Sequence, residues 1–424
     1  RDKGNMSELK RLNTVTLDAE KCKGCVTCMK RCPTEAIRVR DGKASVMYDK
    51  CIGCGECVRL CPYRAKVTSY DKFEVVKNPK YKYRIVLPAP SFYGQFNNLT
   101  DVNYVLEGLK RLGFDEVFEV GRGAELNTLA TQILLNKGSI PKPVISTACP
   151  AVLELIYARF SNLKQHLLNV LPPVDIAAKL AREKAMRKGY KDEEIGVFFI
   201  SPCPAKVYAV KSSMGVKKPY IDGALSSGEI YMKLLSVMKL IKDPENLSKM
   251  GVTGLQWASS GGEAAAAMRG KYLAADGIEN CMHILESVEN GTLNEIEFIE
   301  LNACIGGCVG GVLNVENPFV AKARIRNLRT KFPQIANSLA DTGKPADYYM
   351  VEKPFEDSSV SLDRAEAFNR LLLIQEMYET LPQIDCGLCG APSCRAFCED
   401  VVSGNLPKDA VCPQQKRKDG RDEK

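Results

Sequence analysis

The sequence contains no apolar run that approaches the roughly 20 residues needed to cross a lipid bilayer. A basic-then-apolar leader is also missing, so neither a membrane span nor secretion is expected. No basic stretch is interleaved with aromatic residues as a nucleic-acid groove requires, and we find no kinase or phosphatase motif. These absences predict a cytoplasmic protein without a membrane or nucleic-acid partner.

Cysteine, in contrast, is abundant: the chain has 18, and eight of them form two matched runs near the N-terminus, CKGCVTCMKRCP and CIGCGECVRLCP. Each run has the spacing Cys-x2-Cys-x2-Cys-x3-Cys-Pro of two-cluster bacterial ferredoxins, in which the fourth cysteine ligates the other cluster. Zinc and disulfides are the alternatives, and the doubled spacing with two Cys-Pro endings disfavours both. We expect one 4Fe–4S centre on Cys22, Cys25, Cys28 and Cys61 and another on Cys51, Cys54, Cys57 and Cys32.

The formal net charge of +8 does not indicate a nucleic-acid partner, because that count treats every cysteine as neutral. A 4Fe–4S centre with four thiolates carries about −2 when oxidised, so four such centres would contribute about −8. Without an export signal, so many cysteines also argue against a disulfide scaffold. They predict cluster ligation in a reducing compartment.

The order of predicted strands and helices divides the chain into domains. After a lead-in at 1–14, an internal repeat with strand-like segments and an Asp41-Gly42 hairpin turn predicts a ferredoxin-like α+β domain at 15–75. Residues 80–350 alternate strands and helices, which predicts an α/β body with largely parallel sheets in two lobes, about 80–190 and 191–350. A small Cys-rich helical domain at 360–415 and a disordered tail at 416–424 follow. The expected strands are Tyr83–Leu87, Glu116–Val120, Pro143–Ser146, Ile195–Ile200 and Ile296–Leu301.

Four cysteines of this body share a context: three directly follow predicted strands and the last stands at i+4 from the third. They are Cys149, Cys203, Cys304 and Cys308. Ligand sites in α/β folds lie beyond the carboxyl ends of strands, where loops converge. A single cysteine is more often a small buried hydrophobe, but three equivalent strand ends weaken that alternative. The pattern predicts a third cubane, with the glycines of CIGGCVGGV allowing close backbone approach.

Around these cysteines the sequence resembles the iron-only (FeFe) hydrogenase family, over roughly residues 15 to 330. STACP at 146–150 resembles the family's Thr-Ser-Cys-Cys-Pro motif, and SPCPAK at 201–206 resembles Met-Pro-Cys-x-x-Lys. ELNACIGGC at 300–308 resembles Glu-x-Met-x-Cys-x-x-Gly-Cys, and SGG at 260–262 matches a helix start of the family. The ordered set of motifs is far more specific than any one of them.

The resemblance implies a hydrogenase body with an H-cluster. Its 4Fe–4S cubane would be held by Cys149, Cys203, Cys304 and Cys308, and Cys308 would join it to a diiron subsite with CO, cyanide and azadithiolate ligands. Lys206, which could otherwise be a surface lysine, would donate to a cyanide. Ser201 and Asn302 replace two methionines of the family and would make the surroundings of the cofactor more polar.

The implied activity is reversible H2 oxidation and proton reduction. Electrons would pass through the ferredoxin-type centres to a redox partner, either ferredoxin-like or a signalling enzyme. Maturation proteins would build and insert the diiron subsite.

The sequence departs from the family along its proton route. The relay cysteine is replaced by Ala148, which cannot carry a proton, and the acidic residues further along correspond to Ala130 and Thr131. Because a positioned proton-transfer group contributes about 100- to 10,000-fold, we expect slow turnover. Candidates for another route are Glu263, Glu300, Tyr208 and Cys281. Glu263 ranks first, although its charge would also suit a helix N-terminus, and Cys281 is better explained as a core residue.

Variants that resemble this one, without the relay thiol, are associated with sensing, so the expected role is H2 or redox sensing. The alternative is a non-catalytic iron–sulfur relative that acts in electron transfer or cluster delivery and lacks the diiron subsite. Retention of Cys308 and Lys206 favours the hydrogenase.

Near the C-terminus, the spacing Cys-x2-Cys-x4-Cys-x17-Cys resembles a small iron–sulfur domain of sensory and electron-transfer proteins. It predicts a fourth 4Fe–4S centre, or alternatively a structural zinc, and this centre could be the exit to a partner. The expected ligands are Cys386, Cys389, Cys394 and Cys412, which leaves Cys281 and Cys398 outside all four centres.

Overall fold

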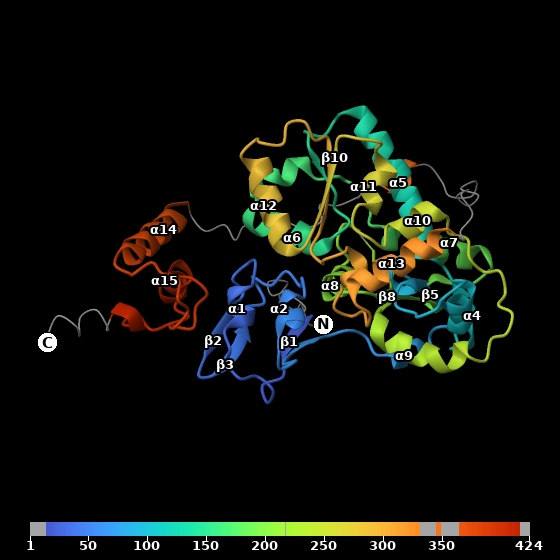
Figure 1. Cartoon of the computed structure of the whole chain (residues 1–424), viewed down its shortest axis with the longest axis horizontal. Coiled ribbons are helices and arrows are strands. Elements are labelled where there is room, and N and C mark those ends of the chain that lie inside the picture. Colours follow the sequence, from blue (N-terminus) through green and yellow to red (C-terminus); the bar gives the residue numbers. More distant parts are fainter. Residues whose placement is uncertain (1–13, 217, 331–344, 349–363, 416–424) are drawn as a thin grey trace, which may run out of the picture. The chain divides into compact units, whose positions relative to one another are not determined.

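The structure, a computed structural model, describes residues 14–216, 218–330, 345–348 and 364–415 (Figure 1). The chain divides into two compact units. The first unit joins residues 1–51 and 56–67 to the C-terminal residues 355–424, and the second, the body, contains residues 52–55 and 68–354. The expected tail at 416–424, and the lead-in up to residue 13, lie outside the described residues.

The N-terminal part of the first unit is built from two short sheets and two short helices that follow the internal repeat. β1 (Val15–Leu17) pairs with β4 (Lys66–Thr68), and β2 (Ile37–Arg40) pairs antiparallel with β3 (Lys43–Val46). Asp41 and Gly42 both have positive φ, as a tight two-residue hairpin turn requires. α1 (Thr27–Lys30) and α2 (Glu56–Leu60) carry cysteines of the two runs. The C-terminal part contributes α14 (Arg364–Glu379) and α15 (Cys394–Val402).

The body contains two parallel sheets, which confirms the predicted α/β class. The larger sheet has the order β6 (Glu116–Val117), β5 (Tyr83–Pro88), β8 (Ile195–Ser201) and β9 (Gly223–Ser226). The smaller has the order β10 (Tyr272–Asp276), β11 (Phe298–Asn302) and β7 (Val144–Ile145). Every residue of β8 is buried, because helices cover both faces of a parallel sheet.

Alternate residues of the central strands point into two separate cores. Val197 and Phe199 pack in one core with side chains of α7 (Pro173–Arg187) and α8 (Pro204–Lys211). Phe198 and Ile200 pack in the other with α4 (Asn103–Arg111) and α9 (Ser227–Met238). This period of two is what an extended strand imposes. The remaining α-helices of five residues or more in the described part of the body are α5 (Val120–Lys137), α6 (Pro150–Arg159), α10 (Val252–Gln256), α11 (Gly262–Ala267), α12 (Ile278–Glu289) and α13 (Pro318–Arg329).

The two sheets divide the body differently from the lobes expected at 80–190 and 191–350. β7, from the earlier stretch, joins the sheet of β10 and β11, whereas β8, from the later stretch, pairs with β5. The chain therefore passes between the two sheets more than once. Parallel neighbours need crossover connections, so strands adjacent in the sequence need not be adjacent in a sheet. Within the described ranges, no helix is long and apolar enough to cross a membrane.

Candidate metal centres

The first predicted ferredoxin-type ligand set surrounds one cavity of the first unit. Cys22, Cys25, Cys28 and Cys61 all line it. Burial raises the pKa of Cys28, and the other three thiols raise it further. Backbone N–H groups point at the sulfurs, as they do around ligating thiolates: Ala44 N lies 3.5 Å from Cys22 Sγ and Ala65 N lies 3.2 Å from Cys61 Sγ. The residues present therefore fit a cluster at this position.

The second predicted set is brought together in part within the first unit. Burial raises the pKa of Cys57, and the thiols of Cys51 and Cys32 add to the effect. Cys32 Sγ accepts from Ala36 N at 3.2 Å, which repeats the Cys61 contact of the other half. Cys54 lies in the segment 52–55 that packs with the body, so its place in this ligand set stays a prediction.

In the C-terminal part, three predicted ligands lie close enough to interact electrostatically. Burial raises the pKa of Cys389, and Cys412 and Cys386 contribute to the shift. Cys394 begins α15, and Cys398, completely buried, follows one turn later. Among the described residues, no three His, Cys, Asp or Glu side chains lie close enough to hold a single metal ion. A cubane needs wider spacing than that, because each thiolate ligates a different iron.

The four cysteines of the body stand where elements of both sheets end. Cys149 lies between β7 and α6, and Cys203 lies between β8 and α8. In both, a proline at the first helical position starts the helix directly after the cysteine. Cys304 follows β11, and Cys308 begins a short 3-10 helix at Cys308–Gly310.

Glycines let this last loop approach its neighbours. Gly307 has a φ of 89°, and a Cβ there would overlap the backbone of Ser260. A Cβ at Gly311 would overlap the carbonyl oxygen of Pro202, one residue before the ligand Cys203. Only glycine allows these approaches, which hold the third motif against the second and against the Ser-Gly-Gly turn.

Lys206 lies within electrostatic reach of all four thiols. Desolvation lowers the pKa of Lys206, but the thiols of all four cysteines act in the opposite direction and raise it overall. The Nζ atom donates to the Ala148 carbonyl at 3.3 Å and lies 3.7 Å from Cys308 Sγ. Burial raises the pKa of Cys203 to about 12, with further contributions from Cys304 and Cys308. Two sheets thus deliver four thiols and one cation to a single site, which fits a cubane with an anionic ligand next to it.

A cavity lies beside Cys308 and Lys206. Its walls are mostly apolar, and its lining includes Ala89, Pro90, Val120, Ala124, Ala148, Pro172, Pro173, Val174, Phe199, Pro202, Trp257 and Ala258. The polar side chains that line it are Ser91, Lys206, Glu263, Glu300 and Asn302. Such a cavity, apolar with a few converging polar groups, suits a compact ligand held in one orientation.

Ser91 is a residue of this cavity that the sequence reasoning missed. Its side chain is 1% exposed, and its hydroxyl has no hydrogen-bond partner among the described residues. A buried hydroxyl normally finds a partner, so this one is available to a group bound in the cavity. The signal was present in the sequence: Ser91 follows the end of β5 three residues after Pro88, as the cysteines follow β7, β8 and β11.

A pair of buried carboxyl groups completes the cavity wall. Ser146 Oγ donates to Glu263 at 2.6 Å and accepts from Ala148 N at 3.1 Å. Burial, followed by the neighbouring Glu300, raises the pKa of Glu263 to about 8. Glu300 accepts from Gly261 N, Ala264 N and the Asn302 side chain at 2.7–3.0 Å, yet burial still raises its pKa.

The other predicted residues lie around the site rather than in it. Ser201 Oγ accepts from Cys203 N and donates to Cys203 O, at 3.4 and 3.0 Å, and so shapes the ligand loop. Cys281 is fully buried in the apolar core and donates to the Asn302 carbonyl at 3.4 Å. Tyr208 stands on α8 and does not line the cavity.

Three family models match the chain. The model described as iron only hydrogenase large subunit, C-terminal domain, matches residues 82–273 and 245–312, which is more than half of the chain. The model described as 4Fe-4S dicluster domain matches residues 14–62, and the model described as Putative Fe-S cluster matches residues 381–413. Models for iron–sulfur clusters therefore match on both sides of the hydrogenase match.

Individual proteins agree with these matches. Iron hydrogenase 1 of Clostridium pasteurianum is 22% identical over 317 residues, which cover 61% of this chain and 55% of that protein. The chain thus spans about half the length of this curated relative. Structures of two variants of [FeFe]-hydrogenase HydA1 from Chlamydomonas reinhardtii match with TM-scores of 0.51 at 18% identity, covering 67% and 64% of this chain and 97% and 95% of theirs. At such identity they show a shared fold. The family model, together with the cysteine sites, shows that this chain belongs to the iron-only hydrogenase family.

Proposed function

We propose that this protein is an FeFe hydrogenase that catalyses reversible H2 oxidation and proton reduction slowly and serves H2 or redox sensing. The observation that carries the proposal is the cavity in which Cys308, Lys206 and the free hydroxyl of Ser91 meet. A protein that held only a cubane would not need an apolar cavity with two donors beside the bridging cysteine. The non-catalytic alternative gives no role to that arrangement.

In this proposal Cys149, Cys203, Cys304 and Cys308 would hold the cubane, and Cys308 would also join it to a diiron unit with CO, cyanide and azadithiolate ligands. The diiron unit supplies the metal site at which H2 is made or split. Lys206 and Ser91 would bind and orient its anionic ligands through charge-assisted hydrogen bonds. Asn302 presents a further polar side chain, and prolines, Phe199 and Trp257 keep water away.

Ala148 stands at the position of the family's relay cysteine and has no proton to exchange. Protons must therefore reach the cavity by another route. Glu263 lines the cavity and bonds to Ser146. Its raised pKa keeps it protonated at neutral pH, and this allows it to give a proton and take one back. Glu300 keeps a second carboxyl nearby, which favours the neutral form of Glu263 by like-charge repulsion.

Electrons would enter or leave through the two ferredoxin-type centres, and the fourth centre near the C-terminus would serve exchange with a redox partner. A slow site of this kind suits a sensor whose output is read by another protein. Maturation proteins would supply the diiron unit.

Infrared spectroscopy of protein produced with its maturation machinery tests the proposal. We expect bands of bound CO and cyanide that change when H2 is added. Complete absence of these bands after maturation would favour the alternative, an iron–sulfur protein of electron transfer or cluster delivery. Iron analysis is a cheaper check, since four cubanes and a diiron pair give about 18 irons per chain.

A further inference from the structure

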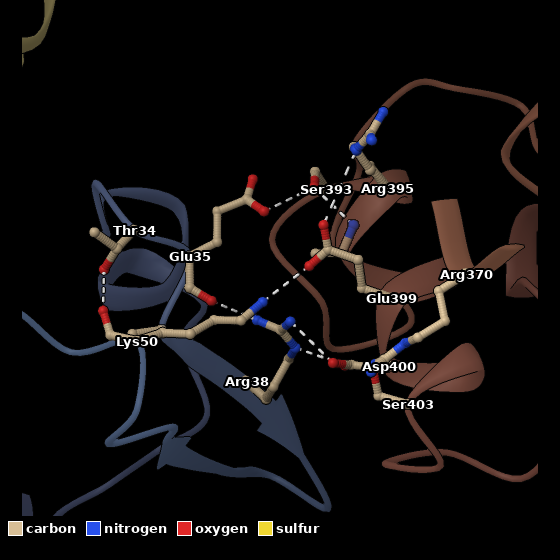
Figure 2. Close-up of polar contacts among 12 residues, drawn as sticks. Thr34, Glu35, Arg38, Lys50, Arg370, Ser393, Arg395, Glu399, Asp400 and Ser403 are labelled. Atoms are coloured by element: carbon tan, nitrogen blue, oxygen red, sulfur yellow. Dashed lines mark hydrogen bonds and ion pairs between the residues drawn. The ribbon is translucent and has the colours of Figure 1, made fainter. Parts of the chain in front are cut away.

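The C-terminal part of the first unit is fastened to the ferredoxin-like part by a buried ion pair. Arg38 of β2 forms a bidentate ion pair with Asp400 of α15: Nε donates to Oδ2 at 2.6 Å and Nη2 donates to Oδ1 at 3.0 Å (Figure 2). Both side chains are almost completely buried, and Arg40 also donates to Asp400. Arg38 Nη1 donates to the backbone carbonyls of Glu35 and Ile37. The arginine thus bonds to its own strand and to α15 at once, and its two parallel bonds to Asp400 fix both the position and the orientation of α15.

Backbone contacts extend this fastening to the loop that carries Cys386 and Cys389. Val39 N donates to the Gly390 carbonyl at 2.9 Å, and a Cβ at Gly390 would overlap the Val39 carbonyl oxygen. Lys30, the last residue of α1, donates to the Asp385 carbonyl and, at 2.7 Å, to the Pro392 carbonyl. We call these contacts together with the Arg38–Asp400 pair the clasp.

The clasp brings sequence neighbours of ligands from two centres together. A Cβ on Gly387, which follows Cys386, would lie 3.0 Å from Met29 Cε. Met29 follows Cys28, is completely buried, and packs in the same small core as Cys22 and Cys28. The same core also contains Cys32 and Cys57 of the other centre, but Met29 directly follows Cys28. Because electron tunnelling falls steeply with distance, these contacts favour the centre of Cys28 as the exchange partner of the C-terminal centre.

We propose that the clasp makes the C-terminal centre a redox neighbour of the centre on Cys22, Cys25, Cys28 and Cys61. One electron leaves a reduced cubane and enters the oxidised one, and no proton or bond is exchanged. Arg38 and Asp400 act as positioning residues in this transfer. The proposal rests on the cluster assignments of the proposed function but not on H2 turnover.

Electron paramagnetic resonance of the full chain, loaded with 4Fe–4S clusters but without the diiron unit and reduced by dithionite, tests the clasp. We expect a magnetic coupling that disappears when Cys412→Ser removes the C-terminal centre. Asp400→Asn should abolish the same coupling with iron content unchanged. Glu399→Gln is the matched control and should preserve the coupling, because Glu399 makes only partly exposed ion pairs, with Lys50 and with Arg395.

Each outcome of this experiment has a distinct meaning. Coupling that survives in Asp400→Asn at full iron content overturns the clasp proposal, as does a wild-type protein in which no coupling depends on Cys412. An unchanged iron count in Cys412→Ser would instead refute the C-terminal centre itself. If Asp400→Asn loses iron, the coupling is measured in Lys30→Met instead. This substitution removes two contacts of the clasp without burying an unpaired charge.

A second inference comes from a different observation, a buried ammonium group in the ferredoxin-like part. Lys66 is 3% exposed, and its Nζ has no hydrogen-bond partner among the described residues. It lines the cavity of Cys22, Cys25, Cys28 and Cys61. It also lowers the pKa of Cys28 and of Cys57, so its charge acts on thiols of both predicted centres.

The internal repeat makes this lysine conspicuous. Lys66 ends CPYRAK, and its counterpart in the first half is Ile37, which ends CPTEAI and is equally buried. One half therefore presents a cation where the other presents an apolar side chain. A buried charge persists only when something compensates it, and an anionic cluster is the compensation this cavity can hold.

We propose that Lys66 raises the reduction potentials of the ferredoxin-type centres. Adding an electron makes a cubane more negative, so a fixed cation beside it favours the reduced form. With Lys66, these centres are better electron acceptors than they would be with an isoleucine at position 66.

Potentiometric titration followed by paramagnetic resonance tests this role. Lys66→Met should lower the reduction equilibrium constant of at least one ferredoxin-type centre on the order of tenfold, which is 59 mV for one electron. Lys23→Met is the matched control, because Lys23 lines the same cavity but is exposed to solvent. Lys66→Arg should restore the wild-type value.

Unchanged potentials in Lys66→Met at full cluster occupancy would overturn the proposal, and so would an equal fall in Lys23→Met. If the methionine variant does not retain its clusters, Lys66→Gln provides the measurement, since it keeps a polar donor while removing the charge.

Discussion

The carboxyl of Glu263 should make the stability of the body depend on pH. Its pKa of about 8 in the folded protein lies above the value of 4.5 for a free glutamate, so the folded state holds a proton that the unfolded state releases. The stabilisation is complete below the unfolded value and is lost as pH rises toward 8. One such proton lowers the free energy of unfolding by about 1.4 kcal/mol per pH unit, or about 3 kcal/mol between pH 5 and pH 7.

Glu263→Gln removes this dependence while keeping the size of the side chain and an acceptor for Ser146. The variant should therefore become more stable relative to the wild type as pH rises. Urea unfolding of protein prepared without the diiron unit can follow this through Trp257, the single tryptophan of the chain, which lines the same cavity. Ser146→Ala is the control: it should cost a constant amount of about 1 kcal/mol and keep the pH slope. A difference between Glu263→Gln and wild type that stays flat from pH 5 to pH 7.5 would refute the assignment of the proton to this pair.

Other substitutions test the remaining parts of the site and the clasp. In matured protein, Ala148→Cys should raise turnover by about 100-fold, and no gain with the cofactor intact would mean that the route proposed through Glu263 does not limit turnover. Glu263→Gln should lower turnover by about 100- to 10,000-fold in the same assay. Ser91→Ala should shift a cyanide infrared band and weaken retention of the diiron unit, by about 1.5–3 kcal/mol if the hydroxyl donates to a charged ligand. Asp400→Asn should destabilise the first unit by about 3–5 kcal/mol, whereas Glu399→Gln should cost less than about 1 kcal/mol in thermal unfolding.

The sequence predicted best what depends on neighbouring residues. The spacing of the two ferredoxin-type runs encodes their geometry locally, and Cys22, Cys25, Cys28 and Cys61 do share a cavity. The strand ends at Cys149, Cys203 and Cys304 were also predictable, because β-rich apolar runs precede each cysteine. The α/β class with parallel sheets was confirmed for the same reason.

Features that depend on contacts distant in sequence were not predicted. The division of strands between the two sheets departs from the expected lobes, since strand order is decided by crossover packing rather than by position in the chain. Arg38 and Asp400 are 362 residues apart, and nothing near either one identifies its partner. Ser91 was missed because a serine after a strand is common, so its place after β5 is a weak signal, and its unpaired, buried hydroxyl is what distinguishes it.

Two lysines indicate how this chain is completed by its clusters. Lys206 lies among four cysteine thiols, and the buried Nζ of Lys66 lacks a hydrogen-bond partner within the described part of the chain. Burial makes an ammonium group costly at both positions, and nearby negative charge offsets that cost. Both become favourable once thiolates and sulfide-bearing clusters supply negative charge. Cluster insertion should therefore stabilise the fold, as metal binding does wherever ligands must be deprotonated and assembled. The same two cations then act on the bound groups, Lys206 by orienting an anionic ligand and Lys66 by favouring the reduced cubane.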